Sequence, residues 1–196
     1  MSAFADLRIG VLALQGAFVE HARMVRACGA RAEEIRKPLS CGAAAGLDAF
    51  DGIILPGGES TVMGKLLLER GLMDALRARI ADGMPVYGSC AGLILLAQQV
   101  EGGTPCFGTM DITARRNAYG RQLGSFFAQG EMAGIGPVPM TFIRAPYIAQ
   151  AGPEVQILAQ VDGRIVAARL GNQLAAAFHP ELSDDLSVHR YFLNML

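Results

Sequence analysis

The sequence lacks the features that mark membrane-spanning, secreted and nucleic-acid-binding proteins. No apolar stretch approaches the roughly 18 residues that a bilayer-spanning helix needs. The segment from Met1 to Asp6 has neither the basic start nor the apolar middle of a secretion signal. The formal net charge is only -1, with both signs spread along the chain, so no basic surface for nucleic acid or an anionic membrane is indicated. We therefore expect neither nucleic acid nor a membrane among the partners of this protein.

Cysteine is also scarce, and its spacing is uninformative about metals. The four cysteines are Cys28, Cys41, Cys90 and Cys106. No two of them have the C-x-x-C spacing of zinc ligands or of dithiol redox centres, so the sequence gives no support to a metal site. Free thiols are typical of a reducing compartment, and we therefore expect a cytoplasmic location.

Apolar residues are plentiful, and in the first half of the chain they form a regular pattern. Hydrophobic residues make up 52% of the chain and charged residues 18%, which predicts a packed globular protein. Predicted strands cover residues 8–14, 31–35, 52–55 and 85–87, and predicted helices cover 18–28, about 60–69, about 72–81 and 90–98. Strands that alternate with helices in this way indicate β-α-β units and an α/β fold with a mainly parallel sheet.

The pattern changes from about Met110, where glycine and proline become frequent and helical spacing fades. Strands are predicted over residues 157–161, 164–170 and 173–178, with Gly171-Asn172 as a hairpin turn, and a closing helix over 186–196. No linker, repeat or low-complexity segment divides the chain. We expect one domain over residues 1–196, with 1–7 as a flexible lead-in.

Cys90 is the cysteine whose surroundings suggest chemistry. It lies in Gly88-Ser89-Cys90-Ala91-Gly92, between a predicted strand and a predicted helix. A nucleophile at such a sharp turn projects from the sheet edge, and flanking glycines relieve the crowding of the backbone. The start of a helix also favours the reactive thiolate, and the N–H of Ala91 would point at an oxyanion on the substrate. The alternative is a buried structural cysteine, the expected role of Cys28 and Cys41.

A thiol nucleophile needs a base, and His179 is the best-placed histidine. It ends an apolar strand and is followed by Pro180-Glu181. Side chains two residues apart can point to the same side of the chain, so Glu181 can hold the imidazole of His179 and stabilise it when charged. His21 and His189 lie in predicted helices, where a surface position or a satisfied core position is the default.

A glycine-rich loop, Pro56-Gly57-Gly58-Glu59-Ser60-Thr61, follows another predicted strand. It fits a phosphate loop poorly, because the spacing to Gly64-Lys65 is one residue off and Leu66 replaces the Ser or Thr that would hold magnesium. A second oxyanion donor suits the loop better, and a plain strand–helix connection stays open. Ser60 or Thr61 is expected to cap the following helix.

Six segments together carry a family resemblance. They are Ile9-Gly10-Val11-Leu12-Ala13-Leu14-Gln15-Gly16, Leu55-Pro56-Gly57-Gly58-Glu59-Ser60-Thr61, Tyr87-Gly88-Ser89-Cys90-Ala91-Gly92, Arg116-Asn117-Ala118-Tyr119-Gly120-Arg121-Gln122, Phe142-Ile143-Arg144-Ala145-Pro146 and Phe178-His179-Pro180-Glu181-Leu182. The chain resembles the glutaminase subunit of pyridoxal 5′-phosphate synthase, a stand-alone class I (triad) glutamine amidotransferase, from about Arg8 to the C-terminus. Ser89 stands where threonine is more usual in that family.

The resemblance implies a flavodoxin-like three-layer sandwich with helices on both faces of the sheet. It implies Cys90 as nucleophile, His179 as base and Glu181 as the residue that orients the base. Backbone N–H groups of Ala91 and of Gly57 and Gly58 would hold the oxyanion. The substrate L-glutamine is implied to lie against Gly58, Glu59, Ser60, Arg116, Ile143 and Arg144. A guanidinium there would neutralise the α-carboxylate of glutamine, although Arg115 beside Arg116 leaves the choice of arginine open.

The resemblance also implies a partner. Ammonia would pass through a tunnel to a separate TIM-barrel synthase subunit in a hetero-oligomer, which builds pyridoxal 5′-phosphate from a pentose phosphate and a triose phosphate. The glutaminase would be weak until that partner docks, and no cofactor or metal is implied. Two other interpretations remain open on the residues alone: a cysteine hydrolase, peptidase or glyoxalase-like enzyme on a related fold, with Glu20 as an early acid, and a non-catalytic binding subunit.

Overall fold

A computed structural model describes residues 3–38, 46–116 and 124–196, so Cys41 and the stretch Asn117 to Gln122 lie outside the described residues. Five parallel strands form the centre of the sheet, in the order β2-β1-β3-β4-β12. They are β1 (Arg8–Leu12), β2 (Arg31–Ile35), β3 (Gly52–Leu55), β4 (Val86–Ser89) and β12 (Gln173–Ala176). This order is that of flavodoxin-like folds, in which ligands bind beyond the carboxyl ends of the strands.

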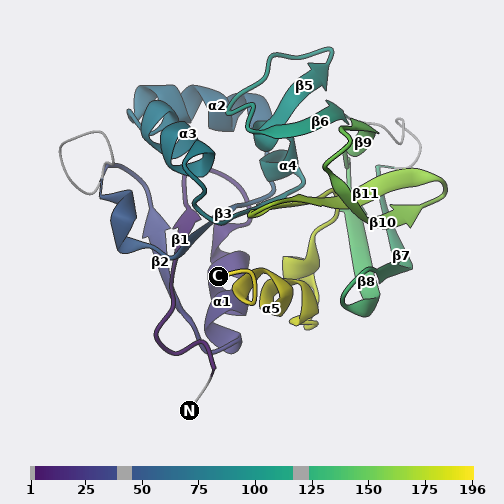
Figure 1. The fold of residues 1–196 in the computed structure, drawn as a ribbon, viewed down its shortest axis with the longest axis horizontal. Coiled ribbons are helices and arrows are strands. Elements are labelled where there is room, and N and C mark those ends of the chain that lie inside the picture. Colours follow the sequence, from purple (N-terminus) through teal and green to yellow (C-terminus); the bar gives the residue numbers. More distant parts are fainter. Residues whose placement is uncertain (1–2, 39–45, 117–123) are drawn as a thin grey trace.

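Helices cover both faces of these strands (Figure 1). One face carries α2 (Ser60–Glu69) and α3 (Met73–Ala81), with the short α4 (Ala91–Leu96) on the same side. The other face carries α1 (Phe18–Ala27) and α5 (Ser187–Leu193), the first and last helices of the chain. The predicted α/β fold with a mainly parallel central sheet between two helix layers is confirmed.

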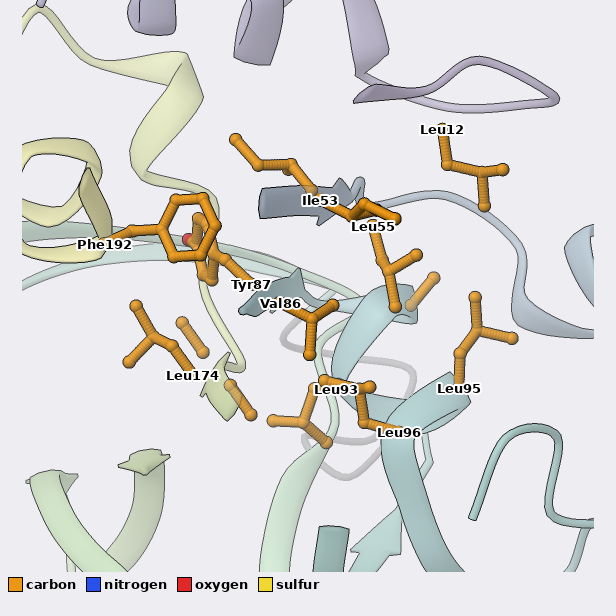
Figure 2. Close-up of a cluster of buried hydrophobic side chains, with 14 of the residues drawn as sticks. Leu12, Ile53, Leu55, Val86, Tyr87, Leu93, Leu95, Leu96, Leu174 and Phe192 are labelled. Carbon is orange, nitrogen blue, oxygen red and sulfur yellow. The ribbon is translucent and has the colours of Figure 1, made fainter. Parts of the chain in front are cut away.

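The inner strand β3 is apolar throughout because both of its faces are covered, whereas β2 at the edge of the sheet also carries exposed charged residues. Ile53, Ile54 and Leu55 of β3 have no exposed surface. Figure 2 shows side chains of the central strands packed against side chains of the helices, among them Leu93 of α4 and Phe192 of α5. Burying one such side chain contributes about 1.5–3 kcal/mol, so the core holds the ends of the strands rigidly in place.

The sheet continues beyond β12 in mostly antiparallel pairings. The further order is β11-β9-β6-β5, with β10 on β11, and β7 and β8 form a separate hairpin. These strands are β5 (Ala97–Glu101), β6 (Met110–Arg115), β7 (Ser125–Met132), β8 (Gly136–Ile143), β9 (Tyr147–Ala151), β10 (Gln156–Val161) and β11 (Arg164–Leu170). The predicted hairpin between β11 and β12 is confirmed by their antiparallel register.

The structure corrects two local predictions. The helix predicted over residues 90–98 ends at Leu96, and Ala97 starts β5 because that segment pairs with β6, from Ala97 with Met110 to Glu101 with Arg115. The helix after the glycine-rich loop is capped by the Glu59 side chain, not by Ser60 or Thr61. The first correction comes from pairing with another strand, and the second from a glutamate side chain that accepts hydrogen bonds from the N–H groups of Thr61 and Val62.

Residues 3–7, part of the predicted lead-in, contain a turn closed by the Leu7 N–H and the Phe4 carbonyl. Phe4 and Leu7 pack against the hydrophobic core as half-buried side chains. No helix in residues 3–38, 46–116 or 124–196 combines the length and the apolar character needed to cross a bilayer.

Candidate active site

Four loops meet at the carboxyl edge of the parallel strands. Gln15 follows β1, the Gly57-Gly58 pair follows β3, Cys90 follows β4 and His179 follows β12. Because neighbouring parallel strands end at the same edge of a sheet, residues far apart in sequence come together there. A pocket of about 300 Å³ opens at this edge, lined by Gln15, Gly58, Glu59, Ser60, Cys90, Ile94, Arg116, Ile143, Arg144, Pro146 and His179.

Cys90 occupies a backbone conformation that side-chain-bearing residues rarely adopt, with φ 47° and ψ -98°. The turn is closed from both sides by glycines. A Cβ on Gly88 would lie 2.5 Å from the carbonyl carbon of Gly92, and a Cβ on Gly92 would lie 2.2 Å from the carbonyl oxygen of Leu55. The predicted sharp turn therefore requires both glycines, and it leaves the Cys90 side chain at the pocket.

His179 lies beside Cys90, and its ring is held by hydrogen bonds to Cys90 on one side and to Glu181 on the other. A Cβ on Gly57 would lie 2.3 Å from His179 Cε1 and 3.4 Å from Cys90 Cβ, so Gly57 fits closely between the two side chains. Burial acts to lower the pKa of His179, but hydrogen bonds to Cys90 and Glu181 outweigh it and raise that pKa to about 10. A protonated imidazole at this position is the partner that a cysteine thiolate needs.

Glu181 fixes which nitrogen of His179 faces the thiol. Its Oε1 lies 2.7 Å from His179 Nδ1, so Nδ1 carries a proton and Nε2 is left for Cys90. Glu181 belongs to the 3-10 helix η2 (Pro180–Leu182) and has no exposed surface. Burial raises the pKa of Glu181, but His21 and His179 overcome that effect, and the pKa lies below its usual value.

Two histidines that the sequence did not single out lie directly beneath this triad. His21 of α1 and His189 of α5 have no exposed surface. His21 contacts Ser89 Oγ at 2.8 Å, His189 Nε2 at 2.9 Å and Glu181 Oε2 at 3.4 Å. A signal for His21 was present in the sequence, because it shares a helix face with the buried Val25 and Cys28 at the spacing i, i+4, i+7.

The predicted substrate-contact residues come together in the pocket, with charges of both signs. Arg116 Nη2 lies 3.0 Å from Glu59 Oε1, and Arg144 lines the same pocket. Arg115 turns away, because it pairs with Glu101 Oε2 at 3.0 Å and donates to the hydroxyl of Tyr147. Of the two adjacent arginines, Arg116 is thus the one that faces the pocket.

The predicted oxyanion donors surround Cys90 without all lining the pocket. Gly58 lines it, Gly57 lies behind against His179, and Ala91 is buried as the residue next to Cys90. The carbonyl of Gly57 accepts from the Ala17 N–H at 3.0 Å, which turns the N–H of Gly58 to the opposite side of the trans peptide.

Gln15 reinforces this loop by accepting from the Glu59 N–H at 2.7 Å. With Ile94 and Pro146, Gln15 belongs to the pocket lining that the sequence prediction had not included. Within residues 3–38, 46–116 and 124–196, no group of three or more His, Cys, Asp or Glu side chains is arranged to hold a metal ion.

Comparisons with known proteins agree with one another over nearly the whole chain. The model of the SNO glutamine amidotransferase family matches residues 11–196. A Methanocorpusculum labreanum protein named pyridoxal 5′-phosphate synthase subunit PdxT is 58% identical, over 97% of this chain and 98% of its own. A Streptococcus pneumoniae protein of the same name is 49% identical, over 96% and 97%.

Solved structures give the same picture. A crystal structure described as a glutamine amidotransferase superposes with a TM-score of 0.88 at 41% identity, covering 95% of this chain and 97% of that one. The PurLQS structure from Thermotoga maritima superposes with a TM-score of 0.69 at 13% identity, covering 96% and 98%, which is a likeness of fold alone.

Proposed function

The chain belongs to the SNO glutamine amidotransferase family, and on that basis we propose that it hydrolyses L-glutamine to L-glutamate and ammonia as the glutaminase subunit of pyridoxal 5′-phosphate synthase. The observation that carries the proposal is that Cys90 and His179 line a pocket with two arginines, while the buried Glu181 holds His179 through its Nδ1. The acid that holds His179 follows it in the chain, as the predicted order Cys, His, Glu requires, and this favours an amidotransferase over the related hydrolases.

In the proposed reaction the Cys90 thiolate attacks the side-chain amide carbon of glutamine. The oxyanion is stabilised by the N–H groups of Ala91 and of the Gly57-Gly58 loop. His179 donates its Nε2 proton to the leaving ammonia, and the γ-glutamyl group stays on Cys90 as a thioester. His179 then takes a proton from water, which attacks the thioester and releases glutamate.

Charge complementarity supports an amino-acid substrate. The α-carboxylate would meet Arg116 and Arg144, and the α-ammonium would meet Glu59, which the structure already pairs with Arg116. A guanidinium–carboxylate contact also fixes orientation. Gly58, Ser60 and Ile143 would complete the contact to the substrate.

The relatives' names include the word subunit, which supports a partner synthase as the consumer of the ammonia. The expected partner is a TIM-barrel subunit in a hetero-oligomer. Ammonia would pass to it through a tunnel, and the glutaminase activity would increase when the partner docks. A cytoplasmic location and the single domain over residues 1–196 remain predictions from the sequence.

The test is glutamate release from the purified chain, with and without the synthase. We expect release that increases with the synthase and disappears in Cys90→Ala. Cys28→Ala is the matched control, because Cys28 is a buried thiol outside the pocket, and its release should equal that of the wild type. No release from the wild type in either case, or full release from Cys90→Ala, would refute the proposal.

A further inference from the structure

The first and last helices of the chain meet beneath the catalytic carboxylate. The α1 helix contacts η2, and α1 and α5 lie on the same face of the sheet in Figure 1. His21 and His189 lie at this junction, with Tyr87 packed edge-on against both rings. Two fully buried imidazoles in hydrogen-bond contact, 2.9 Å apart, are an arrangement that a plain apolar core would not need.

The reason for them lies in the second oxygen of Glu181. Oε1 is taken by His179, while Oε2 is buried and has no hydrogen bond of ordinary geometry within the described chain. A buried carboxylate oxygen without a donor is expensive. His21 Nε2, at 3.4 Å, faces it, and a small rotation of the carboxylate would complete a hydrogen bond.

The contacts of His21 indicate its tautomer. Burial lowers the pKa of His21 and of His189, so both rings are neutral and each carries one proton. A proton on His21 Nε2 points at Ser89 Oγ and Glu181 Oε2, and leaves Nδ1 to accept from His189 Nε2–H. A proton on Nδ1 instead would turn a lone pair toward the carboxylate, which repels it.

The same nitrogen therefore faces both halves of the active site. Ser89 directly precedes the nucleophile, and Glu181 orients the base. We propose that His21 is a positioning residue, whose Nε2–H ties the turn that displays Cys90 to the carboxylate that orients His179, with His189 fixing the tautomer. The proposal rests on the proposed glutaminase function. Without this donor, Glu181 can turn away from His179, and the imidazole loses its alignment with the thiolate.

The kinetic test uses the full chain with its synthase partner and three variants. His21→Leu removes the donor, and kcat should fall roughly tenfold or more, as expected when a hydrogen bond to a buried charge is lost, with KM within about twofold because no substrate contact is altered. His21→Gln keeps an amide N–H near the position of Nε2 and should retain kcat within about threefold of the wild type. Val25→Ala changes a buried apolar residue one turn further along the same helix, controls for lost stability and should keep the wild-type kcat.

The inference is refuted if His21→Leu retains the wild-type kcat, or if His21→Gln loses as much activity as His21→Leu. A loss in Val25→Ala as large as in His21→Leu would also refute it, because general destabilisation would then explain both. Absence of glutamate release from the wild type would instead refute the proposed function, so the two failures are distinguishable.

A second measurement does not depend on turnover. Nitrogen-15 NMR of the histidine-labelled full chain at pH 7 reports which ring nitrogen of each histidine carries the proton. We expect Nε2–H on both His21 and His189. A proton on Nδ1 of His21, or on both of its ring nitrogens, would overturn the assignment of the donor even if the glutaminase is active.

Discussion

Buried His189 should lower the free energy of unfolding in acid, and the size of this contribution follows from its lowered pKa. Desolvation lowers the pKa of His189 from 6.5 to about 3 in the folded state. The folded pKa is depressed, so the neutral ring stabilises the fold above pH 6.5, and that contribution is lost as pH falls toward 3. Between pH 8 and pH 5 the unfolded chain gains a proton that the folded chain cannot take, which lowers the free energy of unfolding by about 2 kcal/mol.

The wild-type profile alone would hide this effect, because His179 acts in the opposite direction. Its folded pKa is raised to about 10, so its contribution is fully present below pH 6.5 and is lost between pH 6.5 and 10. Over the range from pH 8 to pH 5 the two histidines therefore largely offset each other. A comparison with His189→Gln removes the contribution of His179, which both proteins share.

Glutamine at position 189 does not titrate, and its amide can still donate to His21 Nδ1. The free energy of unfolding should be measured by urea titration with far-UV circular dichroism at pH 8, 6.5 and 5. We expect the difference between His189→Gln and the wild type to shift by about 2 kcal/mol in favour of the variant on going from pH 8 to pH 5. A difference that stays constant within about 0.5 kcal/mol would show that His189 is not held neutral by burial.

Three further substitutions test the pocket. Gly57→Ala places a methyl group 2.3 Å from His179 Cε1 and should displace the imidazole. The kcat for glutamine should therefore fall at least about tenfold, and an unchanged kcat would contradict the close fit of Gly57. Arg116→Ala should raise KM for glutamine about tenfold or more by removing a charged contact to the substrate. Arg115→Ala is the control, because Arg115 turns away from the pocket, and its KM should stay unchanged. Equal effects of the two substitutions would show that the wrong arginine was assigned. Glu59→Ala removes the helix cap and should lower the free energy of unfolding by about 1 kcal/mol, measured by urea titration; no change would refute its capping role.

The arrangement of the candidate site could be predicted from the sequence because its parts lie in local patterns. The glycines around Cys90 and the step from His179 to Glu181 are visible in single segments. Cys90 and His179 come together because β4 and β12 are parallel neighbours, and parallel strands end at the same edge of a sheet. The strand predicted over 52–55 agrees with β3 because a strand buried on both faces is apolar throughout.

Most of the errors and omissions arose where contacts between distant residues decide the structure. The predicted helix over 90–98 extended into residues 97 and 98 because their local sequence suits a helix, and only pairing with β6 makes them part of a strand. The cap at Glu59 is a local exception: glutamate is not among the usual capping residues, yet its side chain accepts hydrogen bonds from the N–H groups of Thr61 and Val62. His21 and His189 are 168 positions apart in the sequence, and no local pattern shows that two helices from opposite ends of the chain share one buried junction.

The strained turn at Cys90 sets stability against activity. At φ 47°, a residue that bears a side chain is less stable than glycine by roughly 1–3 kcal/mol because of backbone strain. We therefore expect Cys90→Gly to unfold at higher denaturant concentration than Cys90→Ala, although both are inactive, and equal midpoints would show that the turn is relaxed. If Cys90 is the proposed nucleophile, the turn that displays its thiol keeps the protein below the stability that its fold could reach, and a variant without the thiol can be more stable.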